Sequence, residues 1–165
     1  MATPTTLPAT FVAGNILTAA QMNNLRGAFR VLQVVYADYA LQVVTASSTY
    51  IDTGLTGTIT PQSASSNILV CVSQNGIHKS SNDTSVSVKL VRGASDILFF
   101  GSELGLNASA TQSKIGSASA MMIDSPATTS ATTYKTQFKS DAGLNFGVVQ
   151  RNSITSTLIL MEISA

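Results

Sequence analysis

The sequence predicts a mainly β protein, an antiparallel β-sandwich or jelly roll with one short N-terminal helix. Three observations support this prediction. Runs of β-branched and aromatic residues alternate with polar residues, turn-forming residues separate these runs at short intervals, and no second helical pattern lies between them. Strands that follow one another without helical crossovers favour an antiparallel sandwich over a parallel α/β sheet.

The composition is typical of one folded domain whose surface is covered by small hydroxyl side chains. The 165 residues include 22 Ser and 20 Thr, whereas charged residues make up only 10 %, against about 25 % in typical soluble domains. Apolar residues make up 44 %, which is too high a share for a disordered Ser/Thr-rich segment. Because threonine is favoured in strands, this composition suits β-structure.

Charge and hydropathy exclude several classes of partner. The net charge is +1 and the nine basic residues are scattered, so we expect no nucleic-acid partner. No stretch approaches the roughly 20 apolar residues that cross a bilayer, so we expect no membrane insertion. Residues 1–14 have neither the basic start nor the apolar centre of a secretory signal, and a soluble protein made in a cytoplasm is the expectation.

The chain is expected to begin with an extended arm and a short helix. Thr18 is a good N-cap residue, and Gln21, three residues later, completes a capping box. Apolar residues at the staple positions and along one helical face are Leu17, Met22, Leu25, Phe29 and Leu32. The predicted helix covers about residues 18–31. With the arm it forms a first unit, residues 1–33, ahead of a β-domain over residues 34–165.

The β-domain is expected to contain nine or ten short strands. The segments are VLQVVYA (31–37), LQVVTAS (41–47), GTIT (57–60), SNILVCVS (66–73), TSVSVKLVR (84–92), ILFFGS (97–102), KIGSASAMMID (114–124), TYKTQFKS (133–140), LNFGVVQ (144–150) and ITSTLILMEI (154–163). Pro61 ends the third segment, since proline cannot donate to a ladder. The tripeptide RNS before the last segment reads as a turn.

The segment over residues 84–92 alternates most regularly. Its two inner valines and Leu90 are expected to point into the core, and Ser85, Ser87 and Lys89 are expected to point outward. A strand of this kind normally has one buried and one solvated face.

Two other segments are apolar on both faces. Leu69 and Cys71 make the second face of SNILVCVS apolar, and Leu158 and Leu160 belong to a contiguous apolar run in the last segment. One sandwich core uses only one face of each strand. The surplus indicates either a deeply central position or a contact between identical subunits, and these four residues are the predicted candidates for such a contact.

No catalytic, cofactor or metal site is expected, and the protein is predicted not to be an enzyme. Most acidic residues stand beside Gly, Ser, Asn or Pro, where aspartate favours turns. His78, the only imidazole, lies in the polar stretch NGIHKSSND and is expected in an exposed loop; a catalytic triad would require it, and three copies on a symmetry axis would be needed for a metal site. Cys71 is expected to behave as a small buried hydrophobe.

Four stretches resemble structural proteins of tailed bacteriophages. ATFVAGNILTAAQMNNL (9–25), with its F-x-x-G-x-x-L-T-A-x-x-M-N run, resembles the N-terminal segment of phage fibre and minor structural proteins. The stretch from LQVV to NILVCV (32–72) is similar to the opening of a β-domain of phage virion proteins. TTYKTQFKS and STLILMEI resemble the end of that domain.

This resemblance implies a non-enzymatic virion protein, made in the host cytoplasm, with a homotrimeric jelly-roll head. The first unit would anchor it to other virion proteins, and the residues that would serve this anchor are Phe11, Leu17, Thr18, Gln21, Met22, Leu25 and Phe29. Because no long shaft separates this unit from the β-domain, a short tail-fibre or minor tail knob that contacts a host receptor is the first expectation. A capsid decoration is the alternative.

A polysaccharide-binding or depolymerase module is the alternative of another class. It would require two carboxyl groups, one on each side of the scissile glycosidic bond, or an aromatic platform for a sugar. The chain has no Trp and only ten Phe and Tyr residues. The spacing of the acidic residues favours no particular pair of them as catalytic groups, so the sequence favours the structural role.

Overall fold

The computed structural model describes residues 31–80, 84–106, 113–141 and 145–164, together with Gly14, Ile16, Thr18 and Ala19. The predicted helix over residues 18–31 lies almost wholly outside these residues. Over the described ranges from residue 31 onward the elements are β-strands and one short 3-10 helix, η1 (Arg151–Ser153), with no α-helix among them.

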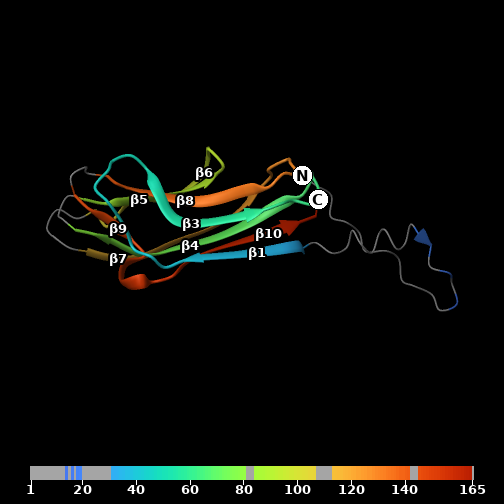
Figure 1. Ribbon diagram of the computed structural model, residues 1–165, viewed down its shortest axis with the longest axis horizontal. Coiled ribbons are helices and arrows are strands. Elements are labelled where there is room, and N and C mark those ends of the chain that lie inside the picture. The colour runs from blue at the N-terminus through green and yellow to red at the C-terminus, as the bar shows by residue number, and fades with distance from the viewer. Residues whose placement is uncertain are drawn as a thin grey trace.

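Ten strands are found within the described ranges. They are β1 (Val31–Tyr39), β2 (Val43–Thr45), β3 (Ile51–Ile59), β4 (Asn67–Lys79), β5 (Val86–Arg92), β6 (Ser95–Leu104), β7 (Ser113–Asp124), β8 (Thr132–Ser140), β9 (Gly147–Val149) and β10 (Ser156–Ile163). They form two facing antiparallel sheets (Figure 1). Sheet A has the order β1-β10-β4-β9-β2, with β7 on the other edge of β4, and sheet B has the order β3-β8-β5-β6.

The pairing is nested in the manner of a long hairpin that has been rolled up. β1 pairs with β10, β2 with β9, β3 with β8, β4 with β7, and β5 with β6 at the tip. Further pairs of β4 with β10 and of β5 with β8 close the two sheets. This is the topology of a jelly roll, and it confirms the predicted antiparallel sandwich.

The strand positions agree with the sequence pattern, and some lengths differ from it. Pro61 follows the end of β3, as expected. β2 and β9 are only three residues long, shorter than predicted. β4 extends to Lys79 and takes in a stretch predicted as a loop, and η1 replaces a predicted simple turn.

Inward side chains of the two sheets form two apolar clusters. One contains Leu55, Val70, Tyr134 and Leu160 among others, and the second is built around Val88 and Phe138. Each of these side chains is fully buried. The alternation of buried and half-buried positions along β8 and β10 shows how a period of two places one face of each strand in the core.

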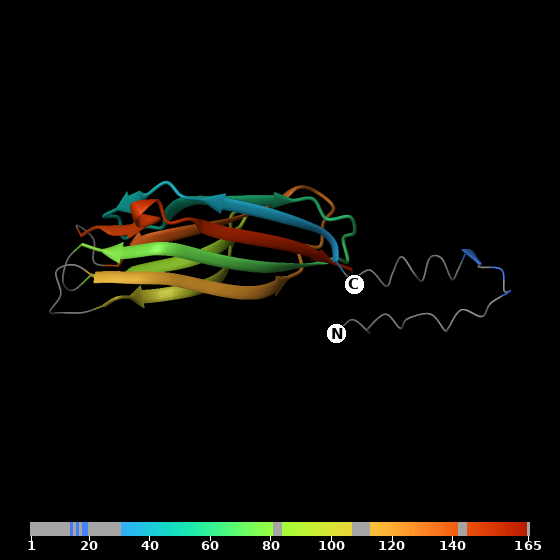
Figure 2. The ribbon, with the colours of Figure 1, turned by 90° about the horizontal axis from the view of Figure 1, so that it is seen from below.

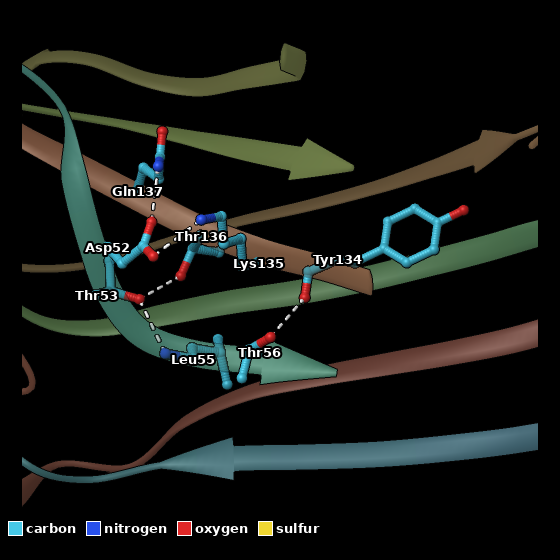
Figure 3. Close-up of polar contacts among 8 residues, drawn as sticks. All are labelled: Asp52, Thr53, Leu55, Thr56, Tyr134, Lys135, Thr136 and Gln137. Carbon is cyan, nitrogen blue, oxygen red and sulfur yellow. Dashed lines mark hydrogen bonds and ion pairs between the residues drawn. The ribbon is translucent and has the colours of Figure 1, made fainter. Parts of the chain in front are cut away.

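A buried chain of hydrogen bonds joins the two sheets, and Figure 3 shows its first link, between Thr53 on β3 and Thr136 on β8. The Thr53 and Thr136 hydroxyls lie 2.5 Å apart, and Thr136 Oγ1 donates to Gln74 Oε1 at 2.9 Å. Gln74 Nε2 then donates to Ser156 Oγ at 3.0 Å. Because all four side chains are fully buried, their polar atoms need these partners to offset the loss of water.

The outer face of sheet B is more covered than the sequence suggests. Ser87 and Lys89 point away from the core, as expected, but they are only 2 % and 8 % exposed. Lys89 Nζ lies 4.2 Å from the centre of the Tyr50 ring and 2.7 Å from Asp96 Oδ1, and Ser87 donates to Asp141. The expectation of a solvated outer face for β5 is therefore corrected by these neighbouring side chains.

Candidate assembly surface

The outer face of sheet A carries two straight rows of apolar side chains. Four strands lie side by side in the order β1, β10, β4 and β7, which Figure 2 shows in blue, red, green and amber. The antiparallel register aligns one row as Val34, Met161, Leu69 and Ile123, and the next row as Tyr36, Ile159, Cys71 and Met121. We refer to these eight residues as the apolar face.

Exposure shows that nothing in the described part of the chain covers this face. On the edge strands, Val34, Tyr36, Met121 and Ile123 are 56 %, 60 %, 70 % and 62 % exposed. The four residues on the two central strands are half-buried by their neighbours. Contiguous exposed apolar side chains of this kind often mark contact sites.

A third row, beside the apolar face, is polar. It consists of Asp38, Thr157, Ser73 and Ser119, which pair across the same four strands. A shallow groove of about 400 Å³ runs between this row and the apolar face, with Cys71, Met121 and Ile159 on its apolar side. An apolar centre with a hydroxyl rim has the anatomy of a protein–protein interface.

The outer face of sheet B has the opposite character. Asp52, Gln137, Lys89 and Phe99 lie in one register row across its four strands. Asp52 accepts hydrogen bonds from Lys135 Nζ at 2.9 Å and from Gln137 Nε2 at 2.7 Å. Charges are thus concentrated on one outer face of the sandwich, whereas Asp38 is the one charged residue in the three rows on the other.

The four predicted contact residues divide between the two faces of sheet A. Leu69 and Cys71 lie on the apolar face. Leu158 and Leu160 are fully buried in the core, so these two side chains have no surface to offer another subunit. Their strand does take part in the face through Ile159 and Met161, which the sequence reading did not single out.

The structure does not test the predicted anchor residues. Thr18 is described but belongs to no helix or strand, and the other anchor residues lie outside the described residues: Phe11, Leu17, Gln21, Met22, Leu25 and Phe29. Their proposed role therefore stays a prediction.

Several acidic residues lie in strands, which corrects the expectation that most of them form turns. Asp124, in β7, accepts from Arg92 Nη1 at 2.7 Å and from the Tyr134 hydroxyl at 2.6 Å. Glu162, in β10, is fully buried, and it accepts from Gln33 Nε2 at 2.6 Å and from the Gln62 backbone N–H at 2.7 Å. These contacts join neighbouring segments, which is a structural role.

The same contacts determine the pKa shifts of the carboxyl groups. Burial alone would raise the pKa of Glu162, but hydrogen bonds from Gln33 and its other donors lower that pKa below its usual range. Asp141 behaves in the same way: burial raises its pKa, and donors that include Ser85 and Lys139 lower it further than burial raises it. Neither carboxyl group has the raised pKa of a catalytic acid.

His78 and Cys71 also differ from what the sequence suggests. His78 lies within β4 and is 5 % exposed, so the expectation of an exposed loop is wrong. Cys71 is half-buried on the outer face rather than in the core. Across the described ranges no group of three or more metal-ligating side chains comes together, and no described helix is long and apolar enough to span a bilayer.

Comparisons with known proteins gave a structural match and no match by sequence. No protein-family model and no curated protein matches the chain. A solved structure similar to it is the crystal structure of the infectious bursal disease virus VP2 subviral particle, with 10 % identity and a TM-score of 0.42. The match covers 82 % of this chain, and the chain spans 38 % of the length of that one.

Proposed function

We propose that this protein is a non-enzymatic structural subunit of a virus particle and that it self-associates through the apolar face. The observation that carries the proposal is the alignment of eight apolar side chains in two rows over four strands. The resemblance of residues 9–25 and 32–72 to phage virion proteins supports the particle as its setting.

The size of the face suits the centre of an interface between copies. Strands about 4.8 Å apart and same-face rows about 7 Å apart give two rows over four strands an area of roughly 300 Å². A specific interface buries about 800 Å² on each partner, with an apolar core inside a polar rim. The apolar face supplies such a core, and the row of Thr157, Ser73 and Ser119 supplies part of the rim.

A second copy of the chain is the occupant that this chemistry favours. The two apolar rows contain no charge, so they offer nothing specific to nucleic acid or to a charged polymer. An identical face is complementary to them in hydropathy and requires no buried ion pair. The finer proposal is a homotrimeric head, held on other virion proteins by residues 1–33 and placed as a short tail-fibre or minor tail knob that contacts the host surface.

The test is the oligomeric state of the full chain, measured by sedimentation velocity at micromolar concentration. The double variant Met121→Glu and Ile123→Glu places two charges on the face at highly exposed positions, and we expect it to sediment as a monomer while the unaltered chain sediments as an oligomer. Leu41→Glu is the matched control, since Leu41 is 68 % exposed and lies outside the face. A monomeric unaltered chain contradicts the proposal.

The place on the particle is tested separately by imaging. Antibody labelling of assembled particles by electron microscopy is expected to mark the tail tip. Labelling spread over the shell would instead establish the capsid decoration, and it would leave self-association through the apolar face unaffected.

A further inference from the structure

The turn between β9 and β10 has unusual backbone conformations. Gln150, Asn152 and Ser153 have φ values of 50°, 58° and 57°, which lie in the left-handed region that non-glycine residues seldom occupy. Three such residues within four positions indicate a segment that its surroundings hold in place. Backbone of this kind clusters at binding sites, where it orients a functional group.

β4 provides the surface on which this turn is held. The Gln150 backbone N–H donates to the Asn75 carbonyl at 2.9 Å. Gly76 has a φ of +64°, and a Cβ atom at this position would lie 2.5 Å from the Arg151 nitrogen. Only glycine therefore allows β4 and η1 to approach so closely, and the approach determines where the Arg151 side chain begins.

Arg151 has no anionic partner in the described part of the chain. The ion pairs found there use Lys89, Arg92, Lys135 and Lys139. Arg151 Nη1 is buried and donates to no acceptor among the described residues. Because a guanidinium stays charged at all ordinary pH values, an incompletely solvated one without an acceptor is unfavourable unless an anion reaches it.

Arg151 also lines a pocket of about 240 Å³. Ile77 and Ile154 provide apolar wall, and Asn152 and the buried His78 provide polar wall. Gly116 leaves part of the wall open, since a Cβ atom there would meet nothing within 4 Å. The pocket shares no lining residue with the groove beside the apolar face.

We propose that this pocket binds a small organic carboxylate and that the Arg151 guanidinium is the partner of its charge. A carboxylate matches the planar donor arrangement of one guanidinium, and the isoleucine side chains suit a short aliphatic part. A phosphate would bring up to two negative charges and three acceptor oxygens to a pocket with a single arginine, so the lining favours the carboxylate.

The test uses His78, which lines the pocket and is the only histidine in the chain. Its ring resonances are followed by NMR in the full chain at fixed pH and ionic strength during titration with sodium butyrate. Butyramide, the uncharged analogue of the same size, is titrated in parallel. We expect saturable shifts with butyrate and at least about tenfold weaker binding of butyramide, because charge-assisted hydrogen bonds are the stronger ones. Sodium glucuronate, titrated in a third arm, distinguishes an acidic sugar from an aliphatic acid.

Variants decide whether Arg151 is responsible. Arg151→Gln is expected to weaken butyrate binding at least about tenfold, whereas Lys135→Gln removes the same charge from sheet B and is expected to change nothing. Arg151→Lys keeps the charge and is expected to bind between the two, which decides the matter if Arg151→Gln alters the fold. Equal responses to butyrate and butyramide, or unchanged binding in both Arg151 variants, would overturn the proposal.

Discussion

At the scale of single residues, the Thr136 hydroxyl lies at the centre of the buried chain of hydrogen bonds that joins the two sheets. It contacts the Thr53 hydroxyl on β3 and the Gln74 amide on β4. The sequence shows these residues only as part of a hydroxyl-rich composition, which predicts solvated surface. The structure shows that some hydroxyls instead connect strands inside the core, where each must find a partner.

Thr136→Val is expected to lower the free energy of unfolding by about 1–3 kcal/mol, because it leaves Gln74 Oε1 and the Thr53 hydroxyl buried with fewer partners. Urea denaturation measures the change. Thr133→Val is the matched control: Thr133 also faces a threonine on β3, with hydroxyls 2.8 Å apart, but this pair is exposed. We expect the control to cost less than about 0.5 kcal/mol, and equal costs would show that the buried chain contributes no more than a surface pair.

The raised pKa of Tyr134 predicts that the free energy of unfolding falls at alkaline pH. Burial raises the pKa of its hydroxyl, and the Asp124 carboxylate, which accepts a hydrogen bond from that hydroxyl, raises the pKa further. The unfolded chain loses this proton near pH 10, while the folded chain keeps it. The unfolded state then binds fewer protons, so the free energy of unfolding falls as the pH rises above about 10.

Urea denaturation between pH 9 and pH 11 tests this linkage. Tyr134→Phe should show a smaller fall over the range than the unaltered chain, since it removes a hydroxyl that stays protonated in the folded state but ionises in the unfolded state. Tyr36→Phe, at an exposed position, should retain the full fall. A fall of the same size in Tyr134→Phe would assign the alkaline effect to other groups.

At the scale of elements, β4 shows where sequence reading succeeds and where it stops. SNILVCVS correctly predicts its first half from β-branched residues with two apolar faces. The continuation through Gln74 and Asn75 reads as a loop because it is polar and contains a glycine. The strand persists there because Gln74 has partners in both sheets, Thr136 on β8 and Ser156 on β10, and register shifts on either side of Ile77 accommodate the irregularity. Such partners are distant in sequence, so no local pattern reveals them.

The apolar face was predictable to the same extent. Leu69 and Cys71 could be predicted as contact residues from the sequence because their strand has two apolar sides. Their alignment with Met121 and Ile159 depends on the pairing of four strands, and pairing register is not readable from single segments. The pocket beside η1 had no sequence signal, since Arg151 looks like an ordinary turn residue there.

Gly76→Ala tests the close approach of β4 and η1. Gly93 offers a matched comparison, because it too has a positive φ, of +58°, but its added Cβ would meet nothing within 4 Å. Gly93→Ala is expected to cost about 1 kcal/mol from backbone strain alone. Gly76→Ala adds a contact with backbone atoms that cannot turn aside, so we expect a cost at least about 1 kcal/mol larger. Denaturant midpoints measure both, and equal midpoints would mean that the turn is free to shift.

At the scale of the whole molecule, the two outer faces differ in kind. Sheet B carries ion pairs such as Lys135 with Asp52, and solvent can hydrate them. Sheet A carries the apolar face, which remains open to solvent in a single copy. This asymmetry makes the sandwich suited to being covered on one side. The described core lies within residues 31–164, and β1 already begins at Val31, so residues 31–33 of the predicted first unit belong to the sandwich.

The head is expected to fold and oligomerise independently of the anchor. Deletion of residues 1–30 should leave a soluble oligomer that unfolds cooperatively but no longer attaches to the particle, because the strands and core begin at Val31. Sedimentation velocity measures the oligomer, and incorporation into particles measures attachment. The full-length variant Leu25→Glu with Phe29→Glu is the companion, since it disrupts only the apolar stripe expected on the anchor helix. It should assemble as the deletion does and likewise fail to attach. Loss of the oligomer in both variants would instead show that the N-terminal segment completes the interface between copies.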